Sequence, residues 1–321
     1  MVVTGKGLKL FLACSGMLTS SALFASPDDR GDGPLIVAQT YVKRVPSGTR
    51  LHQVLNPAQL RLGSRSVLIV DLKDDVVLYG KNVDERRSIA SLTKLMTAMV
   101  VLDARQEMTE QVKITDDDKD FIKFTRSRLK VGAHLTRRDL LYLALAASEN
   151  RSAHALARAY PGGKVSFIAA MNRKAKALGM TSTRFSDSSG LSASNTSTAR
   201  DLLKMVRAAH DYPIIRNMTT ISRGYVRNDG GHSGHYLKFK NTNRLLSRDH
   251  WDINISKTGY IKESGYCLVM HARLIDRPVA IILLNSHGKF SKFADANRVR
   301  RWLVHGGEKL RRRSHYATTR S

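Results

Sequence analysis

Apolar and polar positions follow two different periods along this chain, and each change of period marks a new element. Residues 66–80 (SVLIVDLKDDVVLYG) hold two apolar runs around a charged turn, which predicts a β-hairpin. From residue 88 to about 105 apolar residues recur every three to four positions, the spacing of one buried helix face. Residues 253–286 contain three β-rich runs broken by glycine and proline, and residues 291–306 again have helical spacing. These patterns predict a hairpin, a helix, three further strands and a closing helix.

The region between the first and last strands is predicted to be mostly helical. Thr136 followed by Asp139, and Thr198 followed by Asp201, have the spacing of helix N-caps with an acidic partner in the first turn. Residues 165–180 form a further amphipathic pattern. A hairpin, helices, three strands and a helix, in that order, fit an α+β domain. We expect an antiparallel sheet flanked by helices, with a mostly helical insertion subdomain.

The two ends of the chain differ from the part between them. Residues 1–25 carry two lysines, then an apolar run and small residues before a cleavage position, which is the pattern of a secretory signal peptide. Residues 26–62 have little sustained periodicity and are interpreted as an N-terminal linker. Residues 63–306 form the predicted domain, and residues 307–321 a basic C-terminal tail that we expect to be disordered.

Charge and cysteine content narrow the choice of partners and of compartment. The chain has 53 Lys and Arg residues against 27 Asp and Glu, a net charge of +26, so its surface should attract polyanions. Nucleic acid, anionic membrane and acidic wall polymers all fit, but export argues against nucleic acid. Loss of Cys14 with the signal peptide leaves Cys267 alone, so the fold must hold without an intramolecular disulfide.

Two polar residues stand near the start of the apolar helix. Ser91 and Lys94 are three positions apart and are therefore neighbours on a helix surface. This S-x-x-K pattern alone occurs about once by chance in a chain of this length. Two further groups follow it in order: Ser148-Glu149-Asn150, where an apolar helix turns polar, and Lys257-Thr258-Gly259, between two strand segments. Together the three groups are the signature set of penicillin-recognising serine enzymes.

These residue types supply what acyl transfer from a peptide requires. Ser91 at a helix N-terminus, where the dipole favours developing negative charge, is the candidate nucleophile. Lys94 can take its proton only when neutral, so its pKa must fall from about 10.4 through burial and the nearby positive charge of Lys257. Ser148 can relay a proton to the leaving amine, and Asn150 can hold the base or the substrate amide.

The third group is suited to binding the substrate. Lys257 and Thr258 can bind a carboxylate or carbonyl, and Gly259 leaves the strand face clear for a peptide added as a further strand.

No step of this chemistry needs a metal or a cofactor. The chain has 11 histidines but no H-E-x-x-H motif, and the Asp-rich residues 116–120 lack calcium-loop spacing. We interpret those residues as a solvated turn and His154 as a hydrogen-bonded helix residue.

The chain resembles a known enzyme family over about residues 60–305. Segments such as SIASLTKLMTAMVVLDAR, LALAASENRSAHALA, KNTNRLL and SKTGYIKESGYCLVM are similar to the D-alanyl-D-alanine carboxypeptidase/endopeptidase family. They look most like its branch of type-7 low-molecular-mass penicillin-binding proteins, which are DD-endopeptidases. The resemblance implies a transpeptidase-like fold, related to β-lactamases, in the periplasm. It also implies cleavage of D-Ala–diaminopimelate cross-links in peptidoglycan and covalent acylation by β-lactams such as penicillin.

The same resemblance implies a role for each motif residue. Ser91 would be the nucleophile, Lys94 the base, Ser148 and Asn150 the second active-site element, and Lys257, Thr258 and Gly259 the third. The oxyanion hole would be formed by the backbone N–H groups of Ser91 and Tyr260. One departure is Glu149, where class A β-lactamases have Asp. Another is the basic tail, which lacks the apolar face of a membrane-anchoring helix and favours the endopeptidase branch.

Three alternative interpretations are weighed against this one. A class A β-lactamase needs a further glutamate, and no E-x-x-L-N segment follows Ser148. A metallopeptidase would need a ligand pattern that the sequence lacks. A non-catalytic, basic wall-binding protein would explain the charge but not the intact catalytic set.

Three further residues need no catalytic role. Cys267 is interpreted as a small buried apolar residue, and Asn241 and Asn243 are interpreted as structural or substrate-facing.

Overall fold

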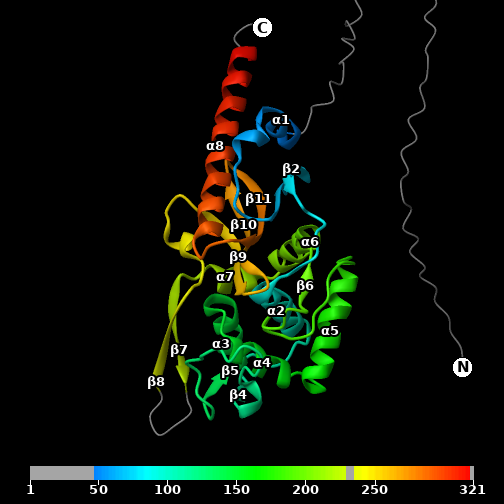
Figure 1. Cartoon of the computed structure of the whole chain (residues 1–321). Coiled ribbons are helices and arrows are strands. Elements are labelled where there is room, and N and C mark those ends of the chain that lie inside the picture. Colours follow the sequence, from blue (N-terminus) through cyan, green and yellow to red (C-terminus); the bar gives the residue numbers. More distant parts are fainter. Residues whose placement is uncertain (1–46, 229–234, 319–321) are drawn as a thin grey trace, which may run out of the picture. The chain divides into compact units, whose positions relative to one another are not determined.

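A five-stranded antiparallel sheet forms the centre of the part of the chain that the structure, a computed structural model, describes: residues 47–228 and 235–318 (Figure 1). Its strand order is β2–β1–β11–β10–β9, so the predicted hairpin and the three late strands form one sheet. The bounds are β1 Ser66–Asp71, β2 Val76–Lys81, β9 Asp252–Ile261, β10 Gly265–Leu274 and β11 Arg277–Ser286. Pairing of β1 with β11 joins segments that are far apart in the sequence.

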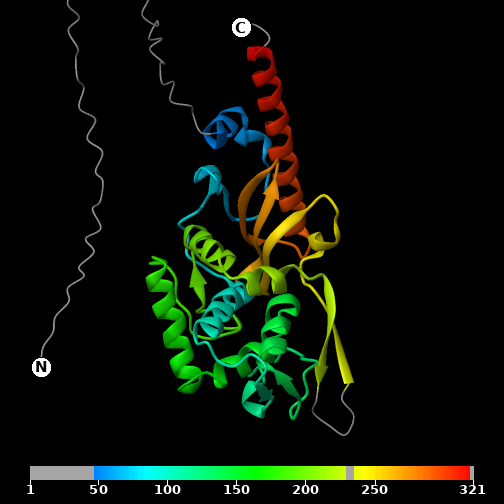
Figure 2. The same ribbon diagram turned by 180° about the vertical axis from the view of Figure 1, so that it is seen from behind.

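Both faces of this sheet are buried. In β1, Leu68 and Val70 belong to one apolar cluster and Val67 and Ile69 to the other, because side chains of a strand alternate between its faces. The first cluster packs against α2 (Thr93–Asp103) and α6 (Ala199–His210), and the second against α1 (Ser47–Val54) and α8 (Ser291–Thr318), as Figures 1 and 2 show. The continuous apolar runs of these strands are thereby explained.

The insertion between the first and last strands of the sheet is mostly helical, as predicted. Its further helices are α3 Arg137–Tyr142, α4 Asn150–Arg158, α5 Gly163–Ala177 and α7 Pro213–Thr220. Three short antiparallel ladders accompany them: β3 Arg87–Ser88 with β6 Thr196–Ser197, β4 Gln111–Lys113 with β5 His134–Thr136, and β7 Arg223–Asn228 with β8 His235–Lys240. The expected α+β fold is confirmed.

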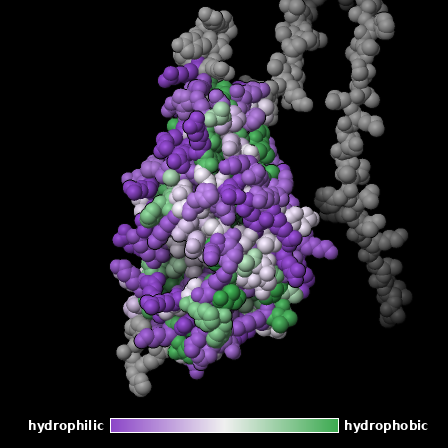
Figure 3. All heavy atoms as spheres, in the orientation of Figure 1, coloured by the Kyte–Doolittle hydropathy of each residue, from purple (hydrophilic) through white to green (hydrophobic). Residues whose placement is uncertain are grey.

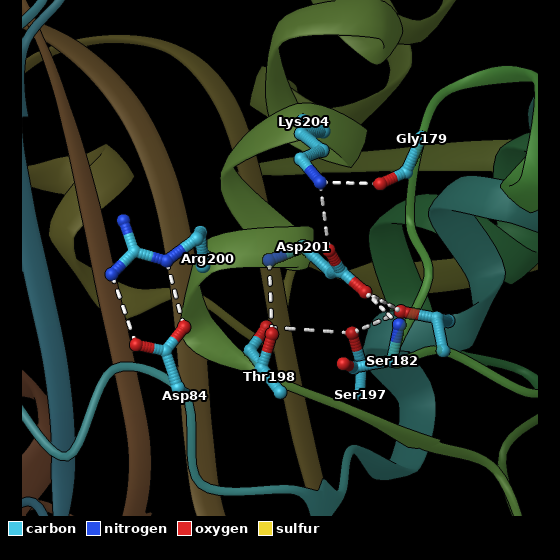
Figure 4. Close-up of polar contacts among 9 residues, drawn as sticks. Asp84, Gly179, Ser182, Ser197, Thr198, Arg200, Asp201 and Lys204 are labelled. Atoms are coloured by element: carbon cyan, nitrogen blue, oxygen red, sulfur yellow. Dashed lines mark hydrogen bonds and ion pairs between the residues drawn. The ribbon is translucent and has the colours of Figure 1, made fainter.

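The predicted N-cap of α6 fixes the loop that precedes it (Figure 4). Thr198 Oγ1 accepts a hydrogen bond from the backbone N–H of Asp201 at 3.1 Å. The Asp201 carboxylate accepts in turn from the Ser182 N–H at 2.8 Å and from Thr183 Oγ1 at 2.9 Å. One buried acid therefore ties the loop after α5 to the first turn of α6. Thr136 caps α3 in the same way, by accepting from the N–H of Asp139.

Both predicted boundaries of the domain are corrected by the structure. The linker predicted for residues 26–62 is wrong from Ser47 onward, because α1 packs on α8 and its Leu51 is 1% exposed. A helix of only two turns gives too short a pattern to detect by period. The disordered tail predicted for residues 307–321 is wrong as far as Thr318, where α8 ends. The predicted signal peptide, residues 1–25, lies outside the described residues.

The contact between α1 and α8 leads to a stability prediction. Replacing Leu51 by Ala should lower the free energy of unfolding by about 3 kcal/mol, because a buried leucine is lost and a cavity is left against α8. Arg50→Ala, an exposed neighbour on the same helix, should change it by less than about 0.5 kcal/mol. Urea unfolding followed by circular dichroism measures both. Equal, small effects would mean that residues 47–54 are a linker after all.

Candidate active site

A short helical turn presents Ser91 at the edge of the central sheet. Residues Ala90–Leu92 form a 3₁₀ turn that leads directly into α2. Ala90 has a φ of +47°, a conformation that L-residues other than glycine rarely adopt. A Cβ at Gly190 would lie 1.9 Å from the Ala90 carbonyl oxygen, so only glycine fits behind this turn. The nucleophile candidate is thus held in a strained turn by close backbone packing.

Lys94 lies one turn into the helix and is fully buried. Its Nζ is 2.9 Å from Ser91 Oγ, 2.7 Å from Asn150 Oδ1 and 2.7 Å from the carbonyl oxygen of Ser189. A neutral amine has two N–H donors and one lone pair. The two donors fit Asn150 Oδ1 and the Ser189 carbonyl, which leaves the lone pair for the hydroxyl proton of Ser91. This set of partners suits an amine that acts as a base.

Burial makes that neutral state accessible near pH 7. Desolvation lowers the pKa of Lys94 from 10.5 to about 7, although the negative charges of Asp187, Glu149 and Asp120 oppose the shift. Lys257 is also buried, and desolvation followed by repulsion from Lys94 holds its pKa well below the usual range. The sequence predicted both burial and a second cation as causes. Burial dominates at Lys94, and the repulsion between the amines is seen at Lys257.

Ser148 and Asn150 stand at a break between two helices. After α3 the chain makes a π-helical turn, Leu143–Ala147, and Ser148 then adopts a φ of +60° before α4 begins at Asn150. The helical stretch is thus interrupted at the motif itself. Asn150 Nδ2 donates to Thr125 Oγ1 at 3.0 Å, while its Oδ1 accepts from Lys94. Ser148 lines the cleft, and among the described residues its hydroxyl makes no hydrogen bond to Lys94 or Lys257.

Strand β9 forms the opposite wall, and it is an edge strand of the sheet. A Cβ at Gly259 would lie 3.1 Å from the backbone N of Ser91, so the strand passes directly against the turn that carries Ser91. Thr258 Oγ1 donates to Thr242 Oγ1 at 2.7 Å, and Tyr260, half exposed, stacks on Tyr266. In the described part of the chain no strand pairs with the outer edge of β9, which leaves room for an added peptide strand.

These elements enclose a cleft of about 790 Å³. Six of the eight predicted site residues line it, namely Ser91, Ser148, Asn150, Thr258, Gly259 and Tyr260. The two lysines lie behind this surface, with Lys94 0% and Lys257 1% exposed. Lys257 Nζ donates to the carbonyl oxygen of Thr258 at 3.1 Å. The structure therefore brings the three motifs together, while the catalytic role of each residue stays a prediction.

A loop that the sequence analysis did not single out holds the Lys94 amine in place. The Asp187 carboxylate accepts hydrogen bonds from the backbone N–H groups of Ser189, Gly190 and Ser192, and from Ser189 Oγ. This turn presents the Ser189 carbonyl to Lys94 and places Gly190 behind Ala90. The available signal was the Asp-Ser-Ser-Gly sequence, which is typical of a turn in which Asp binds its own following backbone.

His154 secures the other side of that loop, as its interpretation as a hydrogen-bonded helix residue required. Its Nε2 lies 3.0 Å from Ser189 Oγ and its Nδ1 lies 3.1 Å from the carbonyl oxygen of Asp118. The Asp-rich segment is not a solvated turn, because Asp118 is fully buried and pairs with Arg158. The described residues contain no group of three or more His, Cys, Asp or Glu side chains arranged to hold a metal ion.

The remaining candidates from the sequence are structural. Asn241 Nδ2 donates to the carbonyl oxygens of Thr219 and Ile221, although the residue also borders the cleft. Asn243 Nδ2 donates to Ser256 Oγ at 2.7 Å. Cys267 is fully buried on β10, and burial raises the pKa of its thiol to about 11. Its interpretation as a small buried apolar residue is confirmed.

The lowered pKa of Lys94 predicts a pH profile. The rate of Ser91 acylation by penicillin should fall about tenfold for each pH unit below 7, because Lys94 is then protonated and cannot accept the hydroxyl proton. Stopped-flow acylation between pH 5.5 and 8.5 measures this. Lys94→Arg, which stays charged, should be inactive throughout the range. A flat profile would show that Lys94 is not the base.

The packing behind Ala90 predicts a second effect. Gly190→Ala should slow acylation at least a hundredfold, because the added methyl meets the Ala90 carbonyl and displaces the catalytic turn. Gly132→Ala is the matched control: its φ of +88° resembles the +85° of Gly190, but nothing lies within 4 Å of the added carbon. The control should lose stability yet acylate normally. Equal loss of acylation in both would assign the effect to backbone strain alone.

Comparison with known proteins gives consistent results for sequence and structure. The D-alanyl-D-alanine carboxypeptidase family, peptidase family S11, matches residues 53–288. A D-alanyl-D-alanine endopeptidase of Escherichia coli K12 is 44% identical over 249 residues, which cover 78% of this chain and 80% of the relative. A D-alanyl-D-alanine endopeptidase of Pseudomonas aeruginosa is also 44% identical, over 250 residues with the same coverage.

Solved structures agree with these relatives. The crystal structure of the Streptomyces K15 DD-transpeptidase superposes with a TM-score of 0.70 at 28% identity, and covers 76% of this chain and 98% of its own. Penicillin-binding protein D2 of Listeria monocytogenes, in its ampicillin-bound form, gives a TM-score of 0.64 at 28% identity over 77% of this chain. The chain belongs to the D-alanyl-D-alanine carboxypeptidase family of serine peptidases.

Proposed function

We propose that this protein is an exported DD-endopeptidase that cuts D-Ala–diaminopimelate cross-links of peptidoglycan in the periplasm. The observation that carries the proposal is the 2.9 Å contact between Ser91 Oγ and the fully buried amine of Lys94. The endopeptidase activity named for the two 44% identical relatives supports a cross-link as substrate, and the pattern of residues 1–25 supports export.

In the proposed reaction Ser91 Oγ attacks the carbonyl carbon of the D-Ala residue while Lys94 Nζ takes the hydroxyl proton. The oxyanion forms beside the N–H groups of Ser91 and Tyr260. Collapse breaks the peptide bond, the proton passes to the leaving amine, and an ester remains on Ser91. Water then attacks that ester, loses a proton to Lys94 and regenerates the serine as the peptide leaves with a free carboxylate.

Release of a carboxy-terminal D-Ala follows the same steps, and we propose it as an accompanying activity. The two activities differ only in the group attached to the leaving amine. The open outer edge of β9 supports the endopeptidase reaction, because a peptide lying along it can continue past the cleft.

The carboxylates near Lys94 argue against efficient β-lactamase activity. Asp187, Glu149 and Asp120 are the acids whose charge acts on Lys94. Each of them already accepts backbone N–H groups: Asp187 in its turn, Glu149 from Arg151, and Asp120 from residues 122, 123 and 125. Among the described residues none of these three carboxylates is hydrogen-bonded to Ser91 Oγ, whose side-chain partner is Lys94. Penicillin should therefore form a long-lived ester.

Intact-protein mass spectrometry tests the proposal. Brief exposure to benzylpenicillin should add the mass of one penicillin to the native protein and none to Ser91→Ala. Digestion of purified cross-linked muropeptides, followed by chromatography, should convert dimers into monomers at the same time. Rapid penicillin hydrolysis without an adduct would identify a β-lactamase instead. If the protein showed neither an adduct nor penicillin hydrolysis, the non-catalytic wall-binding protein would be the remaining interpretation.

A further inference from the structure

The β7–β8 hairpin has two faces of opposite character. Its inner side chains pack on the domain, where Val226 is 2% and Phe239 1% exposed. The ring of Phe239 packs edge to face against the ring of Tyr142, with 4.5 Å between the ring centroids. Successive side chains of a strand alternate between faces. The outward positions are all exposed and consist of cations and tyrosines: Arg223, Tyr225, Arg227, Tyr236, Lys238 and Lys240. Figure 1 shows the hairpin extending from the domain beside α3 and β5.

The pairing of the two strands brings these outward residues opposite one another. Arg223 faces Lys240 across the ladder, Tyr225 faces Lys238, and Arg227 faces Tyr236. Like charges directly opposite each other destabilise an antiparallel pair. The like-charged pair is Arg223 with Lys240, and no acid stands within the described residues of the two strands, 223–228 and 235–240, to offset the repulsion between these two. An anion bound from outside would offset it.

The outward face of the hairpin carries a local concentration of positive charge. Figure 3 shows hydrophilic side chains over much of the face seen in Figure 1, with apolar patches between them, so a hydrophilic surface alone marks no site. The hairpin differs because four cations and two aromatic rings share one ladder face. The Lys238 amine lies 5.8 Å from the centre of the Tyr225 ring, and Arg128 donates to the Lys238 carbonyl oxygen. Arg128 therefore adds a further cation beside the ladder.

This face is continuous with the catalytic cleft. Lys240, the last residue of β8, lines the cleft together with Ser91 and Thr258. Two residues later, Thr242 accepts the hydrogen bond from Thr258 Oγ1. A polymer with one peptide in the cleft would thus meet the row of cations as it leaves the cleft at Lys240.

We propose that the outward face of β7–β8 binds carboxylate groups of neighbouring peptides on the same peptidoglycan polymer. The proposal rests on the proposed function and adds the surface by which the polymer is held. Diaminopimelate keeps a free carboxylate after it is cross-linked, so each peptide offers an anion to Arg223, Lys238 or Lys240. Several weak contacts on one polymer then add up through effective concentration. A membrane is the less suitable partner, because the face has no aliphatic side chain to insert.

Sedimentation with purified sacculi tests this surface. Every protein carries Ser91→Ala so that the wall stays intact. The pair Arg223→Gln/Lys238→Gln should bind sacculi about tenfold more weakly at low ionic strength. Arg173→Gln/Lys176→Gln removes the same charge from exposed positions on α5 and should change binding less than about twofold. The difference should vanish near 1 M salt, where exposed charges are screened within about 3 Å.

Three outcomes would overturn the proposal. Equal losses in the two pairs would show that only net charge matters. An undiminished difference on sacculi with chemically amidated carboxylates would exclude carboxylates as the ligand. A difference confined to vesicles with roughly a third anionic phosphatidylglycerol would assign the face to a membrane.

A separate readout distinguishes this proposal from the proposed function. Arg223→Gln/Lys238→Gln in the protein that retains Ser91 should be acylated by benzylpenicillin at the native rate, because neither side chain lines the cleft. Acylation lost together with wall binding would place the hairpin in the catalytic fold and refute a separate binding role. Absence of acylation in the native protein would refute the proposed function, while the comparison of wall binding would still decide the role of the hairpin.

Discussion

Burial of the Lys94 amine is the constraint on which the rest of this site depends. An ammonium group taken out of water is costly, so the amine is kept neutral more easily than charged. In its neutral form the amine has a free lone pair, and its nitrogen lies 2.9 Å from Ser91 Oγ. The surrounding parts then serve to close the space around it: α2 supplies the lysine, the break before α4 supplies the Asn150 amide, and the Asp187 loop supplies a carbonyl.

Local patterns in the sequence predicted a large part of this arrangement. The hairpin at residues 66–80 and the three late strands are short apolar runs bounded by strong turn signals, and both features are local to the sequence. The caps at Thr136 and Thr198 were predictable for the same reason, because a cap is decided by three or four consecutive residues. The motif residues could be identified from the sequence because all three groups occur together and in the expected order. Each group alone would have carried little information.

Features that depend on tertiary contact could not be derived from local pattern. Gly190 matters because of the Ala90 carbonyl, a residue one hundred positions away in the sequence, and no local window contains both. The left-handed Ser148 interrupts a stretch of good helix formers, so helical spacing continued through it. The helix α1 is stable through its packing on α8 rather than through its own length. Short elements of this kind are decided by what they pack against.

Cys267 has a practical consequence for work on this protein. With a pKa of about 11, only about one thiol in ten thousand is a thiolate at pH 7, and the side chain is fully buried. Alkylating reagents and maleimide dyes should therefore leave the folded domain unlabelled. In a protein prepared without residues 1–25, and so without Cys14, a single cysteine introduced on the surface, for instance on the hairpin, would be the reactive one. Because Cys267 does not react, probes attached to an introduced cysteine would report only from that site, for example on how the wall polymer approaches the cleft.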